Sequence, residues 1–192
     1  MENLEGTNAS EEESLESLLY PAPHELPLRP LPAIKCNYTH HFALNVMGKD
    51  RHDQYVYRHA NGLCIIGLAP THVVLHPTPS VIGVDFNVGK QSRVEMKACG
   101  KRKRNAHILE SNSVLCKVMT SDQFFLIRCC VKGVLLEVNE QLVTSPFLLN
   151  NQASTEGYVA IMMPKPEDWS KAEKALLTRE QYIAERGLSL HA

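Results

Sequence analysis

The sequence lacks the short motifs that mark common catalytic and nucleotide-binding sites. It contains no G-x-S-x-G, no Walker phosphate-binding loop and no G-x-G-x-x-G. Serine, histidine and acidic residues are plentiful, but no spacing among them selects a catalytic triad. We therefore expect a protein that is not an enzyme and that uses no cofactor.

Metal sites, membrane spans and stacking platforms are also poorly supported. The six cysteines include no C-x-x-C pair, which disfavours a zinc site. His72 and His76 would lie about 13 Å apart on a strand, too far to share one ion. No apolar run approaches the roughly 18 residues of a transmembrane helix, so we expect no membrane partner. Aromatic residues make up only 6% of the chain, and single-stranded nucleic acid is usually bound by stacking on such rings.

The first 28 residues contain seven glutamates and neither lysine nor arginine. Five prolines follow between positions 21 and 32, and proline builds neither helix interiors nor central strands. We expect residues 1–32 to be an acidic, proline-rich, disordered leader. No cationic start precedes an apolar run, so we expect no secretory signal and place the protein inside the cell, with reduced cysteines.

Removing that leader changes the charge of the chain. The formal net charge of the whole sequence is −1, but residues 29–192 hold all 20 Lys and Arg against 14 of the 21 acidic residues, a net of +6. A basic body attracts acidic partners at long range: nucleic acid, anionic lipid or an acidic protein surface.

The body from 33 to 163 has the pattern of a mainly β domain. Asn61-Gly62 separates two apolar runs within 55–68 and predicts a hairpin, because both residues tolerate positive φ. The tetrad 120–123 predicts a second turn. We expect further strands at 81–88, 93–99, 107–109, 114–119, 124–131, 134–138 and 158–163. Short, closely spaced strands are typical of a sandwich or barrel.

Residues 164–192 change to a helical period. Two capping signatures, Ser170 with Glu173 and Thr178 with Gln181, predict two short helices or one kinked helix ending at Gly187. We expect Trp169 to anchor this C-terminal helical segment on the β domain.

One part of the β domain resembles the glycine cleavage H protein, a lipoyl carrier. The resemblance covers about thirty residues, Val131 to Tyr158, and rests on Gly133, Glu137–Asn139, Leu142, Pro146, Leu149–Asn150 and Gly157–Tyr158. It implies the lipoyl/biotinyl-like barrel-sandwich hybrid fold for residues 33–163.

The resemblance does not extend to the residue that carries the lipoyl group. In that family a lysine at a hairpin tip lies eleven residues before the glycine that matches Gly133, which is the position of Asp122 here. A carboxylate cannot form the amide with lipoate. Lys117 is the nearest lysine but lies five residues away in an expected strand. A lipoyl-type carrier is therefore a disfavoured alternative.

The chain as a whole resembles the Abitram (Simiate) family. The resemblance rests on the proline-rich lead, Tyr55–Val74, Lys97–Ala106, the CVKGVLLEVNE strand and the LLTREQYI tail. It implies binding of monomeric and filamentous actin and an influence on polymerisation. It also implies residence in the cytoplasm and nucleus, including nuclear speckles, and in actin-rich projections such as lamellipodia, growth cones and dendrites.

Four consecutive cations form the sharpest local signal: Lys101, Arg102, Lys103 and Arg104. Lys90, Arg93 and Lys97 are close in sequence. Four like charges repel one another, so the run adds no stability to the fold. It would speed encounter with the acidic surface of an actin filament, and its attraction would weaken as salt rises.

The same four cations leave other partners open. They match a nuclear-import signal that importin would bind, and they would also grip nucleic-acid phosphates. A solvated loop without a partner remains a further interpretation. We rank an actin-binding regulator first, a nuclear factor that binds nucleic acid or an acidic protein second, and a lipoyl-type carrier third.

Overall fold

The computed structural model describes residues 32–75, 81–89, 92–96 and 107–188. The chain divides into two compact units, residues 1–36 and 37–192. The first unit contributes to the described part only residues 32–36, most of the short helix α2 (Ala33–Asn37). The predicted leader 1–32 thus falls almost wholly outside the described residues, and the domain boundaries at 32 and 163 stay predictions.

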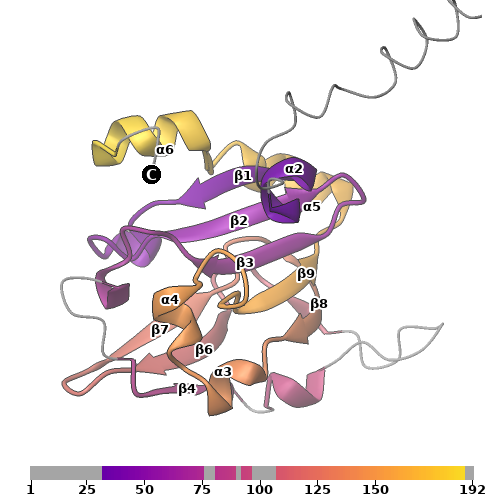
Figure 1. The fold of residues 1–192 in the computed structure, drawn as a ribbon. Helices are drawn as coiled ribbons and strands as arrows, with labels where there is room; N and C mark the ends of the chain where they lie inside the picture. Colours follow the sequence, from indigo (N-terminus) through magenta and orange to yellow (C-terminus); the bar gives the residue numbers. More distant parts are fainter. Residues whose placement is uncertain (1–31, 76–80, 90–91, 97–106, 189–192) are drawn as a thin grey trace, which may run out of the picture. The chain divides into compact units, whose positions relative to one another are not determined.

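The second unit contains two antiparallel sheets in its described part (Figure 1). The larger has the order β10-β1-β2-β3-β9-β8-β5 and the smaller β4-β6-β7. The strands are β1 Tyr38–Ala43, β2 Gln54–His59, β3 Cys64–Leu68, β4 Gly83–Asp85, β5 Ile108–Leu109, β6 Val114–Met119, β7 Phe124–Arg128, β8 Gly133–Val138, β9 Ala160–Met163 and β10 Leu177–Thr178.

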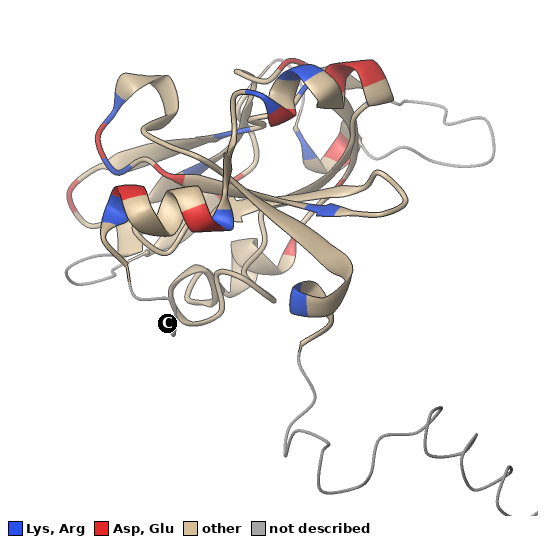
Figure 2. Cartoon of the chain, turned by 90° about the horizontal axis from the view of Figure 1, so that it is seen from above, with Lys and Arg blue, Asp and Glu red and all other residues tan. Residues whose placement is uncertain are grey.

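Helical segments are short and join or follow the strands. The α-helices of the second unit are α3 Gln141–Thr144, α4 Leu148–Asn151, α5 Pro166–Glu173 and α6 Arg179–Arg186. Three 3₁₀ turns, η1 Val46–Gly48, η2 Val73–Leu75 and η3 Val94–Met96, complete the described elements. Most of the charged residues lie on the helices and turns, and few lie on the strands (Figure 2).

The hydrophobic core draws side chains from both sheets. Val56 and Ile66 of the larger sheet belong to the same buried cluster as Val118 and Ile127 of the smaller one. These four side chains have no solvent exposure. These four strands therefore turn one side toward this core, since successive side chains alternate across a strand.

The expected fold class is confirmed: the protein is mainly β, and helices follow the last long strand. Among the described residues, the two sheets do not close into a barrel. The hairpin around Asn61-Gly62 is confirmed as β2–β3, and Gly62 has φ 93°, which an L side chain rarely adopts. The second hairpin is confirmed as β6–β7, with the expected turn at 120–123.

Three strand predictions were wrong in part. The expected strand 124–131 ends at Arg128. Residues 94–96 form η3 instead of a strand, and residues 97–99 lie outside the described part. The run 81–88 contains only the three-residue strand β4. Ile82, which the alternation placed with buried Val84 and Phe86, is 65% exposed.

The C-terminal segment forms two helices with a strand between them. Ser170 was wrongly assigned as a cap, because α5 begins four residues earlier at Pro166, a favoured first position. The second signature is confirmed: Thr178 and Gln181 form a capping box, and Gly187 ends α6 at φ 61°. Trp169 anchors α5 as expected, with 6% exposure and Arg58 over its ring.

Candidate functional site

The four cations Lys101–Arg104 lie outside the described residues, but both flanks of their segment are described. On the N-terminal side, buried Met96 belongs to the core cluster. On the C-terminal side, the carbonyl of His107 accepts a 3.1 Å hydrogen bond from Leu135 in β8, and buried Leu109 pairs with Gly133. The segment 97–106 therefore connects two points that are fixed in the fold.

Arg93 does not extend that basic segment as its place in the sequence suggested. The side chain is only 9% exposed. Its Nε donates to the carbonyl of Val114 at 2.9 Å, and its Nη1 lies 3.1 Å from the sulfur of Met96. We conclude that Arg93 holds η3 against β6 and has little surface left for a partner.

The tip of the β6–β7 hairpin corresponds to the lipoyl-lysine position. Thr120 and Gln123 close the turn with reciprocal hydrogen bonds, and Asp122 is exposed between them. Lys117 lies within β6, where its ammonium group is 4.7 Å from the ring centroid of Phe124. The exposed tip therefore presents a carboxylate, which cannot be lipoylated.

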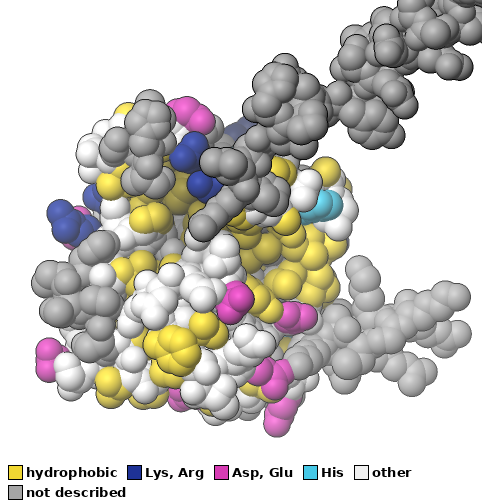
Figure 3. All heavy atoms as spheres, viewed as in Figure 1, with side chains coloured by type: hydrophobic (Ala, Val, Ile, Leu, Met, Phe, Trp, Pro, Cys, Tyr) yellow, Lys and Arg dark blue, Asp and Glu magenta, His cyan; other side chains and the backbone are white. Residues whose placement is uncertain are grey.

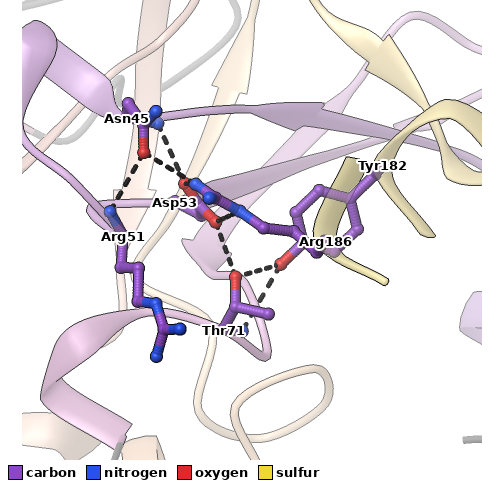
Figure 4. Close-up of polar contacts among 6 residues, drawn as sticks. All are labelled: Asn45, Arg51, Asp53, Thr71, Tyr182 and Arg186. Atoms are coloured by element: carbon purple, nitrogen blue, oxygen red, sulfur yellow. Dashed lines mark hydrogen bonds and ion pairs between the residues drawn. The ribbon is translucent and has the colours of Figure 1, made fainter. Parts of the chain in front are cut away.

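A buried ion pair joins Arg186, at the end of α6, to Asp53, which directly precedes β2 (Figure 4). Arg186 donates two hydrogen bonds to Asp53, from Nε to Oδ2 and from Nη2 to Oδ1, each at 2.7 Å. The Asp53 side chain has no solvent exposure, and that of Arg186 is 16% exposed. Bidentate pairing of this kind fixes orientation as well as charge. Arg186 thereby fastens the end of α6 to the residue that precedes β2.

Three further side chains complete this network. The Thr71 hydroxyl donates to Asp53 Oδ2 at 2.5 Å and lies 2.6 Å from the Tyr182 hydroxyl. The Asn45 side chain accepts from Arg186 at 2.7 Å, and the Asn45 backbone N–H donates to Asp53 at 2.9 Å. Burial alone would raise the pKa of Asp53, but the hydrogen bonds from Arg186, Thr71 and Asn45 and the charge of Arg186 bring this pKa below its usual value.

The loop held by this network is conformationally unusual. Asn45, Met47 and Arg51 have φ values of 44°, 60° and 52°, in the left-handed region that non-glycine residues seldom occupy. The Asn45 side chain accepts from the backbone N–H of Arg51 at 3.0 Å and so supports the loop from within. Such strain persists only where the surroundings impose it.

An acidic cavity of about 520 Å³ lies where β8 meets α3. Its lining consists of Glu137, Val138, Asn139, Glu140, Gln141, Glu156 and Tyr158. Buried Asn139 donates to the carbonyls of Glu156 and Tyr158 at 2.7 and 2.9 Å, which fixes the two walls relative to each other. The Tyr158 hydroxyl donates to Glu137 at 2.7 Å, and burial followed by this contact raises the pKa of Tyr158.

Cys64 and Cys129 are buried thiols of low reactivity. Burial raises the pKa of Cys64 and of Cys129 to about 12, so both are protonated at neutral pH. Cys130 follows β7 with φ 59° and is half-buried, instead of alternating with Cys129 within one strand. Cys99, beside the four cations, lies outside the described residues.

Within residues 32–75, 81–89, 92–96 and 107–188, no three His, Cys, Asp or Glu side chains are grouped so as to hold a metal ion. None of the helices in these ranges is long and apolar enough to cross a membrane.

The fold and the sites described here define a small, mainly β protein with polar surface sites and no assembled catalytic centre among its described residues. No family model matches the chain. It is 35% identical to bovine and human Protein Abitram over 147 residues, 76% of this chain and 79% and 81% of those proteins. Identity is also 35% to Protein Abitram of Dictyostelium discoideum over 139 residues, 72% of this chain and 77% of that protein.

The chain therefore belongs to the Abitram family. Among solved structures, the glycine cleavage system H protein of Mycobacterium marinum aligns with a TM-score of 0.49 at 14% identity, over 70% of this chain and 91% of that one. This is the family that residues 131–158 resemble in sequence.

Proposed function

We propose that this chain is a non-enzymatic actin-binding protein that regulates polymerisation by binding monomeric and filamentous actin. Membership of the Abitram family, at 35% identity over three quarters of the chain, is the observation that carries the proposal. The resemblance to that family implies actin as the partner, with pools in the nucleus and cytoplasm.

The proposed contact is electrostatic. Lys101, Arg102, Lys103 and Arg104 supply four adjacent positive charges to an acidic filament surface. The flanks at Met96 and His107 are tied to the core and to β8, so the segment joins a rigid support. Preorganised flanks reduce the entropy lost when such a segment docks.

A nuclear factor is the second candidate, because the same four cations suit importin or nucleic-acid phosphates. In the described part, two of the stacked ring pairs, Tyr55–Tyr57 and Phe42–Tyr182, lie in buried positions, where they are not stacking platforms for bases. This observation favours actin over single-stranded nucleic acid as the first partner to test.

Co-sedimentation with filamentous actin tests the proposal. The full chain is compared with a variant in which Lys101–Arg104 are all alanine, at about 50 and 200 mM salt, which spans a Debye length of roughly 14 to 7 Å. We expect the wild type to pellet, less so at higher salt, and the variant to pellet severalfold less at low salt.

A charge-matched control separates position from net charge. Lys49, Lys165, Lys171 and Lys174 are exposed lysines elsewhere on the body, and replacing all four by alanine removes the same charge. This control is expected to pellet like the wild type. Equal losses in both variants would reduce the effect to net charge, and absence of pelleting by the wild type would overturn the proposal in favour of the nuclear factor.

A further inference from the structure

Five aliphatic side chains share the side of the larger sheet that faces away from the core. In the strand register, Ile65 lies opposite Ile161, Met163 opposite Val134, and Val134 opposite Ile108. Ile161 and Met163 are two residues apart on β9 and so point the same way. We call this set the open apolar face: Ile65, Ile108, Val134, Ile161 and Met163.

The exposure of these side chains distinguishes the two sides of the same strands. Ile108 is 55% exposed and the other four members are partly exposed. Their neighbours Ile66, Met162 and Leu135 are fully buried in the core. A half-solvated antiparallel sheet normally alternates apolar and polar residues, but here both sides are apolar. Hydrophobic side chains gather over β9 and β8 in Figure 3, with acidic ones along the lower border.

The open apolar face ends at the acidic cavity. Glu137 lies opposite Ile161 in the register and therefore on the same side of the sheet. Glu137 also lines the cavity, with Glu140 and Glu156 as the other carboxylates. The hydrogen bond from Tyr158 orients the Glu137 carboxylate. An apolar surface with a negative end disfavours phosphate-bearing ligands, because three carboxylates repel them.

The covered part of the same sheet side shows what fits such a surface. Phe42, Tyr55 and Tyr57 lie in register with Ile65 through β1, β2 and β3, so they share its side. There α6 packs its Tyr182 ring flat on Phe42, with centroids 4.0 Å apart. The same helix sends Arg186 into the carboxylate of Asp53. One helix thus places a ring on the apolar surface of the sheet and an arginine on a neighbouring carboxylate.

We propose that the open apolar face, with the acidic cavity at its end, docks an amphipathic helix of a partner protein. The helix would lay aliphatic side chains on Ile65, Ile161 and Met163 and place a lysine or arginine in the cavity. This repeats, with an external segment, the pairing that α6 makes internally. The site has the opposite charge to Lys101–Arg104 and is independent of the proposed actin contact.

Two designed peptides test the proposal with the full chain. Each is a fluorescein-labelled amphipathic helix of about four turns, with leucines on one side and either two arginines or two glutamates in its last turn. Fluorescence anisotropy is expected to show the arginine peptide binding at least about tenfold more tightly than the glutamate peptide. Equal affinities, or no binding of the arginine peptide up to about 1 mM, would overturn the proposal.

Variants then assign the contact. Glu137→Gln with Glu156→Gln should remove most of the difference between the peptides, and Ile161→Thr with Met163→Thr should weaken both about tenfold. Ile82→Thr, at an exposed isoleucine that directly precedes β4 of the other sheet, is the matched control and should change neither affinity. A loss of affinity in the control equal to that in Ile161→Thr/Met163→Thr would contradict the assignment.

Amide NMR of the wild type tests the location without substitutions. The arginine peptide should shift resonances of β3, β8, β9 and residues 156–158 and leave β4, β6 and β7 unchanged. Shifts confined to another surface would overturn the proposal. Binding of anionic vesicles or of an oligonucleotide that shifts the same resonances would assign the face to lipid or nucleic acid instead.

Discussion

The outer side of the larger sheet consists of two parts that differ in what lies over them. Over β1 and β2, helix α6 covers Phe42 through Tyr182, and Arg186 secures the helix at a buried carboxylate. Over β3, β9 and β8, aliphatic side chains stay partly exposed beside an acidic cavity. One part of this side of the sheet is covered by the chain's own helix α6. In our proposal, the other part is covered by a helix of a partner protein.

The two parts of this surface have different roles: the covered part contributes to stability, and the open part is the proposed binding site. The covered part forms only when distant segments of the chain come together, because Asp53 and Arg186 are 133 residues apart in sequence. The open part needs only strands that are already paired. We therefore expect substitutions in the covered part to affect unfolding and those in the open part to affect binding.

Asp53→Ala should have the largest effect on stability. It removes the carboxylate that Arg186 and the Thr71 hydroxyl contact, and removing one partner of a buried pair typically costs about 3–5 kcal/mol. Urea denaturation measures the free energy of unfolding. Glu110→Ala, which breaks the exposed ion pair with Lys132, is the control and should change stability little. A similar loss in both variants would contradict the structural role of Asp53.

Tyr182→Ala should destabilise the protein by about 3 kcal/mol. It removes a buried ring that stacks on Phe42 and a hydroxyl that bonds to Thr71. Tyr182→Phe keeps the ring and should cost only about 1 kcal/mol. Thermal unfolding distinguishes the two substitutions, and equal shifts in melting temperature would mean that the ring contributes nothing beyond its hydroxyl.

Acid should weaken the loop that supports the covered part. Burial lowers the pKa of His72 from 6.5 to about 3, and its Nδ1 accepts from the backbone N–H of Val74 at 3.1 Å. Since the unfolded chain binds this proton more readily, the stabilising contribution is complete above pH 6.5 and declines as pH falls toward about 3. From pH 6.5 to about 5 the loss is about 2 kcal/mol from this group.

Asp53 affects stability at a lower pH than His72 does. The pKa of Asp53 is lowered on folding, so its contribution to stability is present above the unfolded pKa near 3.8 and is lost at lower pH.

The variant His72→Asn tests the contribution of His72, because it keeps an acceptor for the Val74 N–H and removes the titration. Chemical denaturation across pH should give this variant a shallower slope between pH 6.5 and about 5. An unchanged slope would assign the acid sensitivity to other groups.

The smallest effect is expected at the open apolar face. Ile65 and Ile66 are adjacent in β3 and point to opposite sides, the first partly exposed and the second fully buried. Ile65→Thr should change stability by less than about 1 kcal/mol, whereas Ile66→Thr should cost about 3 kcal/mol. Comparable losses on urea denaturation would mean that the outer side is packed like the core.

Local patterns in the sequence predicted the elements that local chemistry specifies. Asn61-Gly62 and the tetrad 120–123 fixed two hairpins, and Thr178 with Gln181 fixed the start of α6. Predictions failed where packing overrides pattern. Val94–Met96 was expected to be extended, but buried Arg93 bonds to Val114 and Met96 and stabilises a 3₁₀ turn there. Ser170 resembled a cap but lies inside a helix that Pro166 starts.

The sites divide in the same way. The run Lys101–Arg104 was visible in the sequence because adjacent charges need no fold to be recognised, and it lies outside the described residues. The Asp53–Arg186 pair and the acidic cavity were missed, because their members come from segments that only the folded sheet brings together. No periodicity or spacing signals such a pair.

By itself the sequence determined a mainly β body, its hairpins, its last helix, the Asp122 that excludes lipoylation at the hairpin tip, and membership of the family. These depend on residue identity or on contacts within a few positions. Only the tertiary structure decided which side of β3, β9 and β8 is buried. Isoleucine and methionine occur on both sides of these strands, so the side that faces the core follows from the register and from the packing of the smaller sheet against that side.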